Sequence, residues 1–219
     1  THEGMADANG TPSHQLTDLY IKLAKGGAGA IITGYAGVQK NGKPLNNMLM
    51  IDDDRFIEIY RTINRELKQY GVPVIVQIAH GGGKSDPSIT KEEAVAPSAM
   101  RYPMPPNTAR ELTQDGIEQI IESFVKGIVR AREAQFSGVE LHAAHGYLLS
   151  EFLSPAMNKR TDMWGGSSEN RFRIIAEIIR RAREKTGSFP ILMKYSAYDG
   201  DKNGIRIEEG IKIAKMFEQ

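Results

Sequence analysis

The chain has 219 residues, a length that suits one large domain or two small ones. It carries 28 Lys and Arg against 27 Asp and Glu, and the net charge of +1 excludes the broad basic surface of a nucleic-acid-binding protein. The absence of Cys excludes disulfides, zinc–thiolate sites and thiol nucleophiles. Since no apolar run is long enough for a transmembrane helix and THEGMADANG is not a signal peptide, we expect a cytoplasmic protein with no membrane partner.

Helical and strand patterns alternate along the chain. The spacing of apolar residues predicts helices over 13–25 and 53–70, after the N-cap residues Thr113 and Ser167, and from about Ile207 to Gln219. Apolar runs rich in β-branched residues predict strands over 28–35, 72–80, 137–145 and 189–196. This alternation indicates parallel βα architecture, and we expect the four strands to be adjacent and parallel in that order.

The number of strands is too small for a closed barrel. A (β/α)8 barrel needs eight strands and about 250 residues, whereas this sequence predicts four strands, begins in a loop and ends within a helix. The simplest interpretation is a piece of a larger barrel. An open four-stranded sheet with its own complete core is the alternative.

The segment 81–112 is a long connection that contains five prolines. Connections of this length without periodic structure are usually functional in compact domains. It follows a strand, at the end of the sheet where βα proteins place their sites. We therefore expect a lid or an interface arm.

The residues best suited to chemistry follow the third predicted strand. His142, His145 and Tyr147 lie within HAAHGYLL, where the strand gives way to a loop. Alternation along a strand would separate the two imidazoles, but a strand that ends near Ala144 lets the turn bring both to one pocket. Two imidazoles and a phenol can polarise a carbonyl and supply a proton. A metal site is a weaker alternative, because H-x-x-H has no intervening Glu and no helix to present it.

Two polar residues interrupt strands that otherwise read as apolar. Gln77 lies in VPVIVQIAH and Lys194 in FPILMKYS. Burying either side chain costs free energy unless it has a hydrogen-bonding or ionic partner. Gln77 can form an internal hydrogen bond and Lys194 an ion pair. Alternatively, with the His pair they form a cofactor site at the carboxyl ends of the strands.

The stretch HAAHGYLLSEFLSPAMNKRTDMWGGSSENRFR at 142–173 closely resembles the signature of the old yellow enzyme family of FMN-dependent ene-reductases. THEGMADANGTPS, GGAGAIITGYAGVQKNGK and VQIAHGGGKS are similar to family segments as well, so the resemblance covers essentially the whole chain. It implies an α/β fold, a partial TIM (β/α)8 barrel, with residues 1–219 as a single incomplete FMN-binding domain. The four predicted strands would be the second to fifth, with the first and the sixth to eighth absent.

The resemblance also implies roles for individual residues. His142 and His145 match the pair that holds the substrate carbonyl, and Tyr147 matches the phenol that protonates the neighbouring carbon. These three are the expected catalytic and substrate-binding residues.

The expected flavin-binding residues come from several segments of the chain. Besides His142, Gln77 matches the amide at the edge of the isoalloxazine, and Gly37 a small residue whose backbone lies against it. Thr1 matches the residue near flavin N5 and O4. Lys194 stands where the family has Arg, beside N1 and O2, and is a point charge without a bidentate fork.

Two further departures concern Gly83, which replaces an Arg, and Trp164, which replaces a Tyr. The missing strands would carry the phosphate site, which in such barrels lies after strands seven and eight.

The implied activity is reduction of the C=C bond of α,β-unsaturated carbonyl compounds by FMN, with NADH or NADPH as reductant and no metal. The implied partners are an enone or phenolic ligand and a second copy in a homo-oligomer. The alternative is a non-catalytic half-barrel that needs a partner chain and binds no flavin by itself.

Overall fold

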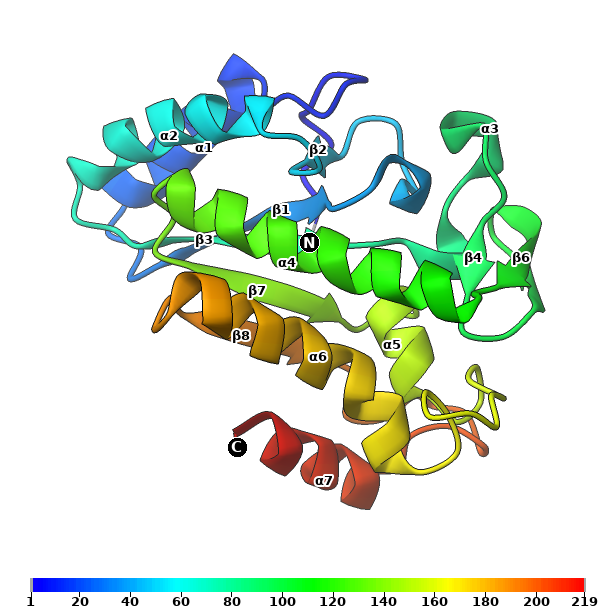
Figure 1. Ribbon diagram of the computed structural model, residues 1–219. Helices are drawn as coiled ribbons and strands as arrows, with labels where there is room; N and C mark the ends of the chain where they lie inside the picture. Colours follow the sequence, from blue (N-terminus) through cyan, green and yellow to red (C-terminus); the bar gives the residue numbers. More distant parts are fainter. Residues whose placement is uncertain (1, 219) are drawn as a thin grey trace.

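A computed structural model describes residues 2–218, and its centre is one parallel sheet (Figure 1). The strands are β1 (Ile31–Gly37), β2 (Leu49–Met50), β3 (Val74–Ala79), β7 (Gly138–Ala143) and β8 (Ile191–Tyr195), in the order β2-β1-β3-β7-β8. The four predicted strands are therefore adjacent and parallel in the predicted order. Two details differ: β1 begins and ends later than predicted, and the edge strand β2, which has only two residues, was not predicted.

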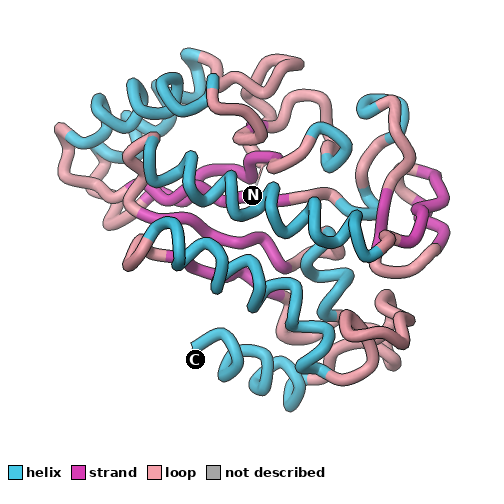
Figure 2. Tube along the Cα trace, viewed as in Figure 1, coloured by secondary structure: helices cyan, strands magenta, loops and turns pink. Residues whose placement is uncertain are grey.

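Helices connect the strands and cover one face of the sheet (Figures 1 and 2). They are α1 (His14–Lys25), α2 (Arg55–Lys68), α4 (Gln114–Glu133), α5 (Leu148–Leu153), α6 (Ser168–Thr186) and α7 (Ile207–Glu218). The predicted caps are confirmed, because Thr113 accepts a hydrogen bond from the backbone N–H of Gly116 and Ser167 from that of Asn170. Each long helix begins where the sequence predicts.

The core lies between the helices and the sheet, and the pleat decides which residues enter it. Val76 and Ile78 of β3 and Val139 and Leu141 of β7 are fully buried on the helical side. The alternate positions carry polar side chains to the opposite face. Ile32, on β1, is 44% exposed.

The segment 81–112 is more ordered than its sequence suggests. It contains two short helices, η2 (Gly82–Lys84) and α3 (Pro87–Thr90), and the strands β4 (Val95–Ala96), β5 (Met100–Pro103) and β6 (Pro106–Glu111). These three strands form a small sheet in the order β4-β6-β5, which we name the cap. An unstructured connection was therefore the wrong expectation, since these short strands pair only in the folded chain.

The cap is held to the body by side chains from later in the sequence. Arg160 donates to the backbone carbonyls of Pro97, at 2.9 Å, and Leu112, at 2.7 Å. Tyr102 of β5 donates its hydroxyl to Glu151 of α5 at 2.8 Å. The cap thus has a fixed position beside the carboxyl ends of the main strands.

Candidate functional site

His142 and His145 meet at the carboxyl end of β7. His142 is 1% exposed, and the ring centroids of the two imidazoles are 5.1 Å apart in an edge-on arrangement. His145 adopts a left-handed backbone conformation with φ of 60°. This turn ends the strand and brings both rings to one side, as the sequence argument predicts.

Tyr147 completes the cluster from the first turn beyond the strand. It is the N-cap residue of α5, and its ring centroid lies 4.9 Å from that of His142. Burial raises the pKa of the Tyr147 phenol, and a hydrogen bond with Tyr35 partly offsets the rise. A phenol that keeps its proton at neutral pH is suited to donate it.

Both imidazoles have a lowered pKa, which favours their neutral form. Burial, followed by the nearby charges of His145, Lys194 and Lys84, lowers the pKa of His142 to about 3. Burial and the same two lysines lower the pKa of His145. Each neutral ring has one N–H to donate. The Nδ1 atom of His142 is buried and has no hydrogen-bond partner among the described residues.

Tyr35 is a site residue that the sequence argument missed. Its ring lies edge-on to that of Tyr147, with centroids 5.3 Å apart, and stacks on His2 at 5.2 Å. The signal was a large aromatic side chain in AIITGYAG, a run otherwise made of small and aliphatic residues. Its inward direction follows from the register of β1, in which Tyr35 pairs with Gln77.

Gln77 and Glu140 lie on neighbouring strands in the middle of the sheet. The amide nitrogen Nε2 of Gln77 donates to Oε1 of Glu140 at 2.5 Å. This is the internal hydrogen bond that the sequence suggested for Gln77. It uses only half of the amide, because Oε1 of Gln77 is buried with no partner in the described part of the chain.

The remaining predicted cofactor residues are more dispersed. Lys194 pairs in register with His142 and is half-buried, and no ion pair of Lys194 is present within residues 2–218. The ion pair suggested for it is therefore not found there. Gly37 ends β1 beside Met50, and an added Cβ would lie 2.6 Å from the Met50 sulfur, so a larger residue would have to displace this side chain. Thr1 lies outside the described residues.

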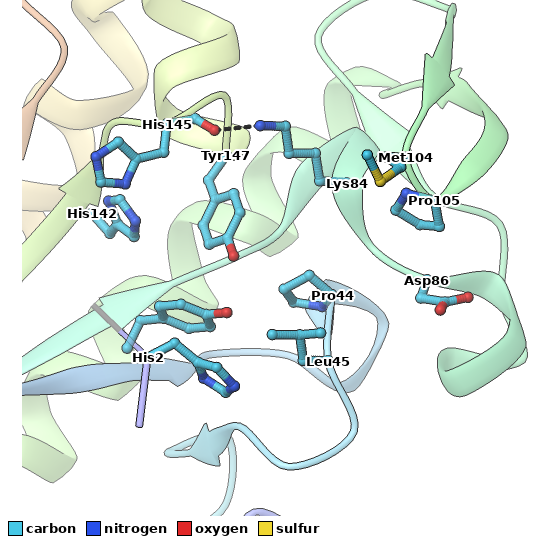
Figure 3. Close-up of a pocket in the computed structure, with 11 residues that line it drawn as sticks. His2, Pro44, Leu45, Lys84, Asp86, Met104, Pro105, His142, His145 and Tyr147 are labelled. Atoms are coloured by element: carbon cyan, nitrogen blue, oxygen red, sulfur yellow. Dashed lines mark hydrogen bonds between the residues drawn. The ribbon is translucent and has the colours of Figure 1, made fainter. Parts of the chain in front are cut away.

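The cluster opens into a cavity of about 620 Å³ at the carboxyl end of the sheet (Figure 3). Its lining residues come from the N-terminal segment, the loops after β1, β3 and β7, and the cap. They are His2, Tyr35, Pro44, Leu45, Lys84, Asp86, Met104, Pro105, His142, His145 and Tyr147. Lys84 donates to the backbone carbonyl of His145 at 2.6 Å, which ties two of these loops together.

The cap contributes to the cavity through the turn between β5 and β6. Met104 and Pro105 line it, and Met104 is 80% exposed (Figure 3). An apolar rim above a polar floor suits a small organic ligand with one polar end. The expected lid position of segment 81–112 agrees with this placement.

The two departures from the family pattern have structural explanations. A Cβ at Gly83 would lie 2.0 Å from the ring of Tyr102, so the cap tyrosine occupies the space beside this glycine. Trp164 is buried and donates its indole N–H to Gln114 at 2.6 Å. Neither residue lines the cavity.

Neither a metal cluster nor a membrane-spanning helix is present in residues 2–218. No cluster of three or more His, Asp or Glu side chains is placed to hold a metal ion there. No helix in the same range is long and apolar enough to cross a membrane.

Comparison with known proteins decides the family. The profile of the NADH:flavin oxidoreductase / NADH oxidase family matches residues 2–219. The chain belongs to this family. It is 40% identical over 218 residues to an NADH oxidase from Thermoanaerobacter brockii. The alignment covers 98% of this chain and 34% of the relative. It is 34% identical to an NADPH dehydrogenase from Bacillus subtilis, with 97% of this chain and 61% of the relative aligned.

Solved structures agree with the sequence relatives. A 2-naphthoyl-CoA reductase complex superposes with a TM-score of 0.95 at 29% identity, over 100% of this chain and 35% of its own. The old yellow enzyme homologue from Zymomonas mobilis superposes with a TM-score of 0.90 at 27% sequence identity. This superposition covers 99% of this chain and 64% of the homologue's chain. The parallel sheet is therefore part of a TIM barrel, and the interpretation as a self-contained open sheet is not supported. The chain spans about a third to three fifths of the length of these proteins.

Proposed function

We propose that this chain carries the substrate site and the flavin-ring site of an FMN-dependent oxidoreductase of old yellow enzyme type. The reaction is NADH- or NADPH-driven reduction of the C=C bond of α,β-unsaturated carbonyl compounds. The observation that carries the proposal is the convergence of His142, His145 and Tyr147 on one cavity at the carboxyl end of a parallel sheet. Residues 1–219 would form a single incomplete barrel domain. Cytoplasmic location and self-association are further predictions from the sequence.

The residues that fit FMN lie on β1, β3, β7 and β8, and among them only His142 lines the cavity. The unpartnered Oε1 of Gln77 and Nδ1 of His142 are buried polar atoms, and each costs free energy until a ligand satisfies it. A flavin ring offers both donors and acceptors along its polar edge. Lys194, beside His142, supplies a positive charge that stabilises a reduced flavin. Gln77, Lys194, His142 and the backbone at Gly37 would hold the ring, and bound FMN supplies hydride transfer, with electrons from NADH or NADPH.

The protein's own groups orient and polarise the substrate. The imidazoles of His142 and His145 donate their N–H groups to the carbonyl oxygen, which draws electron density from the conjugated C=C bond. Their low pKa values keep them neutral, so they bind the oxygen without protonating it. Tyr147 holds the proton that goes to the carbon next to the carbonyl. The cap residues Met104 and Pro105 cover the apolar end of the substrate.

The alternative function, a non-catalytic half-barrel, has one observation in its favour. Near the outer edge of the sheet Tyr198, Ile207 and Ile211 are each more than half exposed, at 55%, 53% and 52%. Such residues suit contact with further chain, either the protein's own or a partner's. The two functions differ in whether flavin is bound.

The test separates the two halves of the reaction in the FMN-loaded protein. Flavin absorbance follows reduction by NADPH under anaerobic conditions, and then reoxidation by 2-cyclohexen-1-one. We expect Tyr147→Phe to leave reduction by NADPH unchanged and to slow reoxidation by about 100-fold, the usual contribution of a general acid. Equal reoxidation rates for the variant and the parent would remove Tyr147 from the chemistry. Failure to bind FMN in a protein that carries the complete barrel would favour the non-catalytic alternative.

A further inference from the structure

Glu140 is a buried carboxylate on β7, two residues before His142, that the proposed chemistry does not use. It is 8% exposed and pairs in register with Gln77, which is 1% exposed. Its neighbours on β7, Val139 and Leu141, point into the helical core, so Glu140 faces the opposite side with His142. A carboxylate in the middle of a sheet is costly to bury, and its retention requires a reason.

The only hydrogen bond of the Glu140 side chain within the described residues is with Gln77. A carboxylate accepts and cannot donate, so the amide of Gln77 must turn its NH2 group toward Glu140. The reverse orientation would place two acceptor oxygens face to face. This argument fixes the amide by chemistry, independently of how its nitrogen and oxygen are assigned.

A consequence follows for the other end of the amide. Oε1 of Gln77 is forced away from Glu140, and it is buried there without a partner among residues 2–218. The hydrogen bond from Nε2 to the carboxylate also polarises the amide and makes Oε1 a stronger acceptor. The pair therefore turns a strong acceptor, Oε1 of Gln77, away from Glu140, where a ligand donor can satisfy it.

We propose that Glu140 is a positioning residue for the flavin, acting through Gln77. It holds the amide so that Oε1 accepts the imide N–H at position 3 of the isoalloxazine, the one donor on that edge of the ring. The inference rests on the proposed function, because it requires that FMN binds. Glu140 itself need not touch the cofactor.

Exchanging the two residues tests the direction of the amide. Gln77→Glu alone sets two carboxylates against each other and should weaken FMN binding by about tenfold or more, since roughly 1.4 kcal/mol corresponds to a factor of ten. The exchanged pair, Gln77→Glu with Glu140→Gln, has the same net charge as the parent. Its residue 140 donates and its residue 77 still presents an oxygen to the ring. We expect the exchange to restore the dissociation constant to within about threefold of the parent.

The measurement is the FMN dissociation constant of the complete apoprotein, from quenching of flavin fluorescence. Glu151→Gln removes another buried carboxyl, whose partners are Tyr102 and Gly83, and serves as the matched control. It should bind FMN as the parent does. An exchanged pair that binds no better than Gln77→Glu alone overturns the proposal, because the ring would then need the NH2 group that the exchange removes.

A spectroscopic readout distinguishes positioning from a general effect on the fold. One Raman band of bound flavin shifts when the N3–H hydrogen is exchanged for deuterium. The position of this band reports the strength of the hydrogen bond that the flavin N3–H donates to Oε1 of Gln77. We expect Glu140→Gln, which is isosteric, to move this band toward its position in free FMN, while Glu151→Gln leaves it in place. An unchanged band in Glu140→Gln would also overturn the proposal, and it decides the matter even if Gln77→Glu does not fold. Failure of the proposed function would instead appear as an absence of FMN binding in the parent protein.

Discussion

The carboxyl of Glu151 should make the stability of this protein depend on pH. It lies on α5, is fully buried, and its Oε1 accepts hydrogen bonds from the Gly83 backbone at 2.9 Å and the Tyr102 hydroxyl at 2.8 Å. Its Oε2 has no partner among the described residues. Burial raises the pKa of Glu151 from 4.5 to about 8, with the two hydrogen bonds and the charge of Lys84 as smaller opposing effects.

The sign and size of the effect follow from this rise. Folding favours the protonated carboxyl, so the contribution of Glu151 to the free energy of unfolding is highest at low pH and falls as pH rises from about 4.5 to about 8. Between pH 5 and pH 9 the loss amounts to about 4 kcal/mol, taking 1.36 kcal/mol for each pKa unit.

Glu151→Gln removes the titration and keeps the shape and the acceptor oxygen. We expect the variant to gain stability over the parent as pH rises, by up to about 4 kcal/mol across this range. Urea denaturation at pH 5, 7 and 9 measures the difference. Glu58→Gln, on the exposed side of α2, is the control and should follow the parent. Parallel pH profiles for Glu151→Gln and the parent would refute the argument.

Three further predictions concern ligands and packing. Replacing His142 and His145 with Ala should weaken binding of a phenol by about 1.5–3 kcal/mol for each lost hydrogen bond, measured at saturating FMN because His142 is also placed at the flavin, and unchanged phenol titrations would contradict this. Gly82→Ala should lower the free energy of unfolding, measured in urea, by about 2 kcal/mol more than Gly166→Ala does. Both glycines have positive φ, but only at Gly82 would an added Cβ lie against Glu151, at 2.3 Å. Equal losses in the two variants would show that backbone strain alone matters. The present chain by itself should bind FMN weakly, and stoichiometric sub-micromolar binding in a fluorescence titration would disprove this.

The main parallel layer was predictable because its signals are local. Helical spacing after Thr113 and Ser167 and the apolar strands between the helices specify both the type and the order of the elements. Parallel strands joined by helices then leave few topologies open. The cap was not predictable in this way, since its strands have only two to six residues and its position depends on contacts of Arg160 and Tyr102 with distant segments.

The sequence alone determined the part of the site that is contiguous in the chain. His142, His145 and Tyr147 are close in sequence at one strand end, so a single turn brings them together. Only the tertiary structure decided their surroundings: Tyr35 beside Tyr147, Glu140 beside Gln77 at a separation of 63 residues, and Glu151 with Tyr102 at 49. The physical reason is that periodicity and capping depend on a residue's immediate neighbours, whereas the partner of a buried polar group depends on strand register and on contacts between segments distant in the chain.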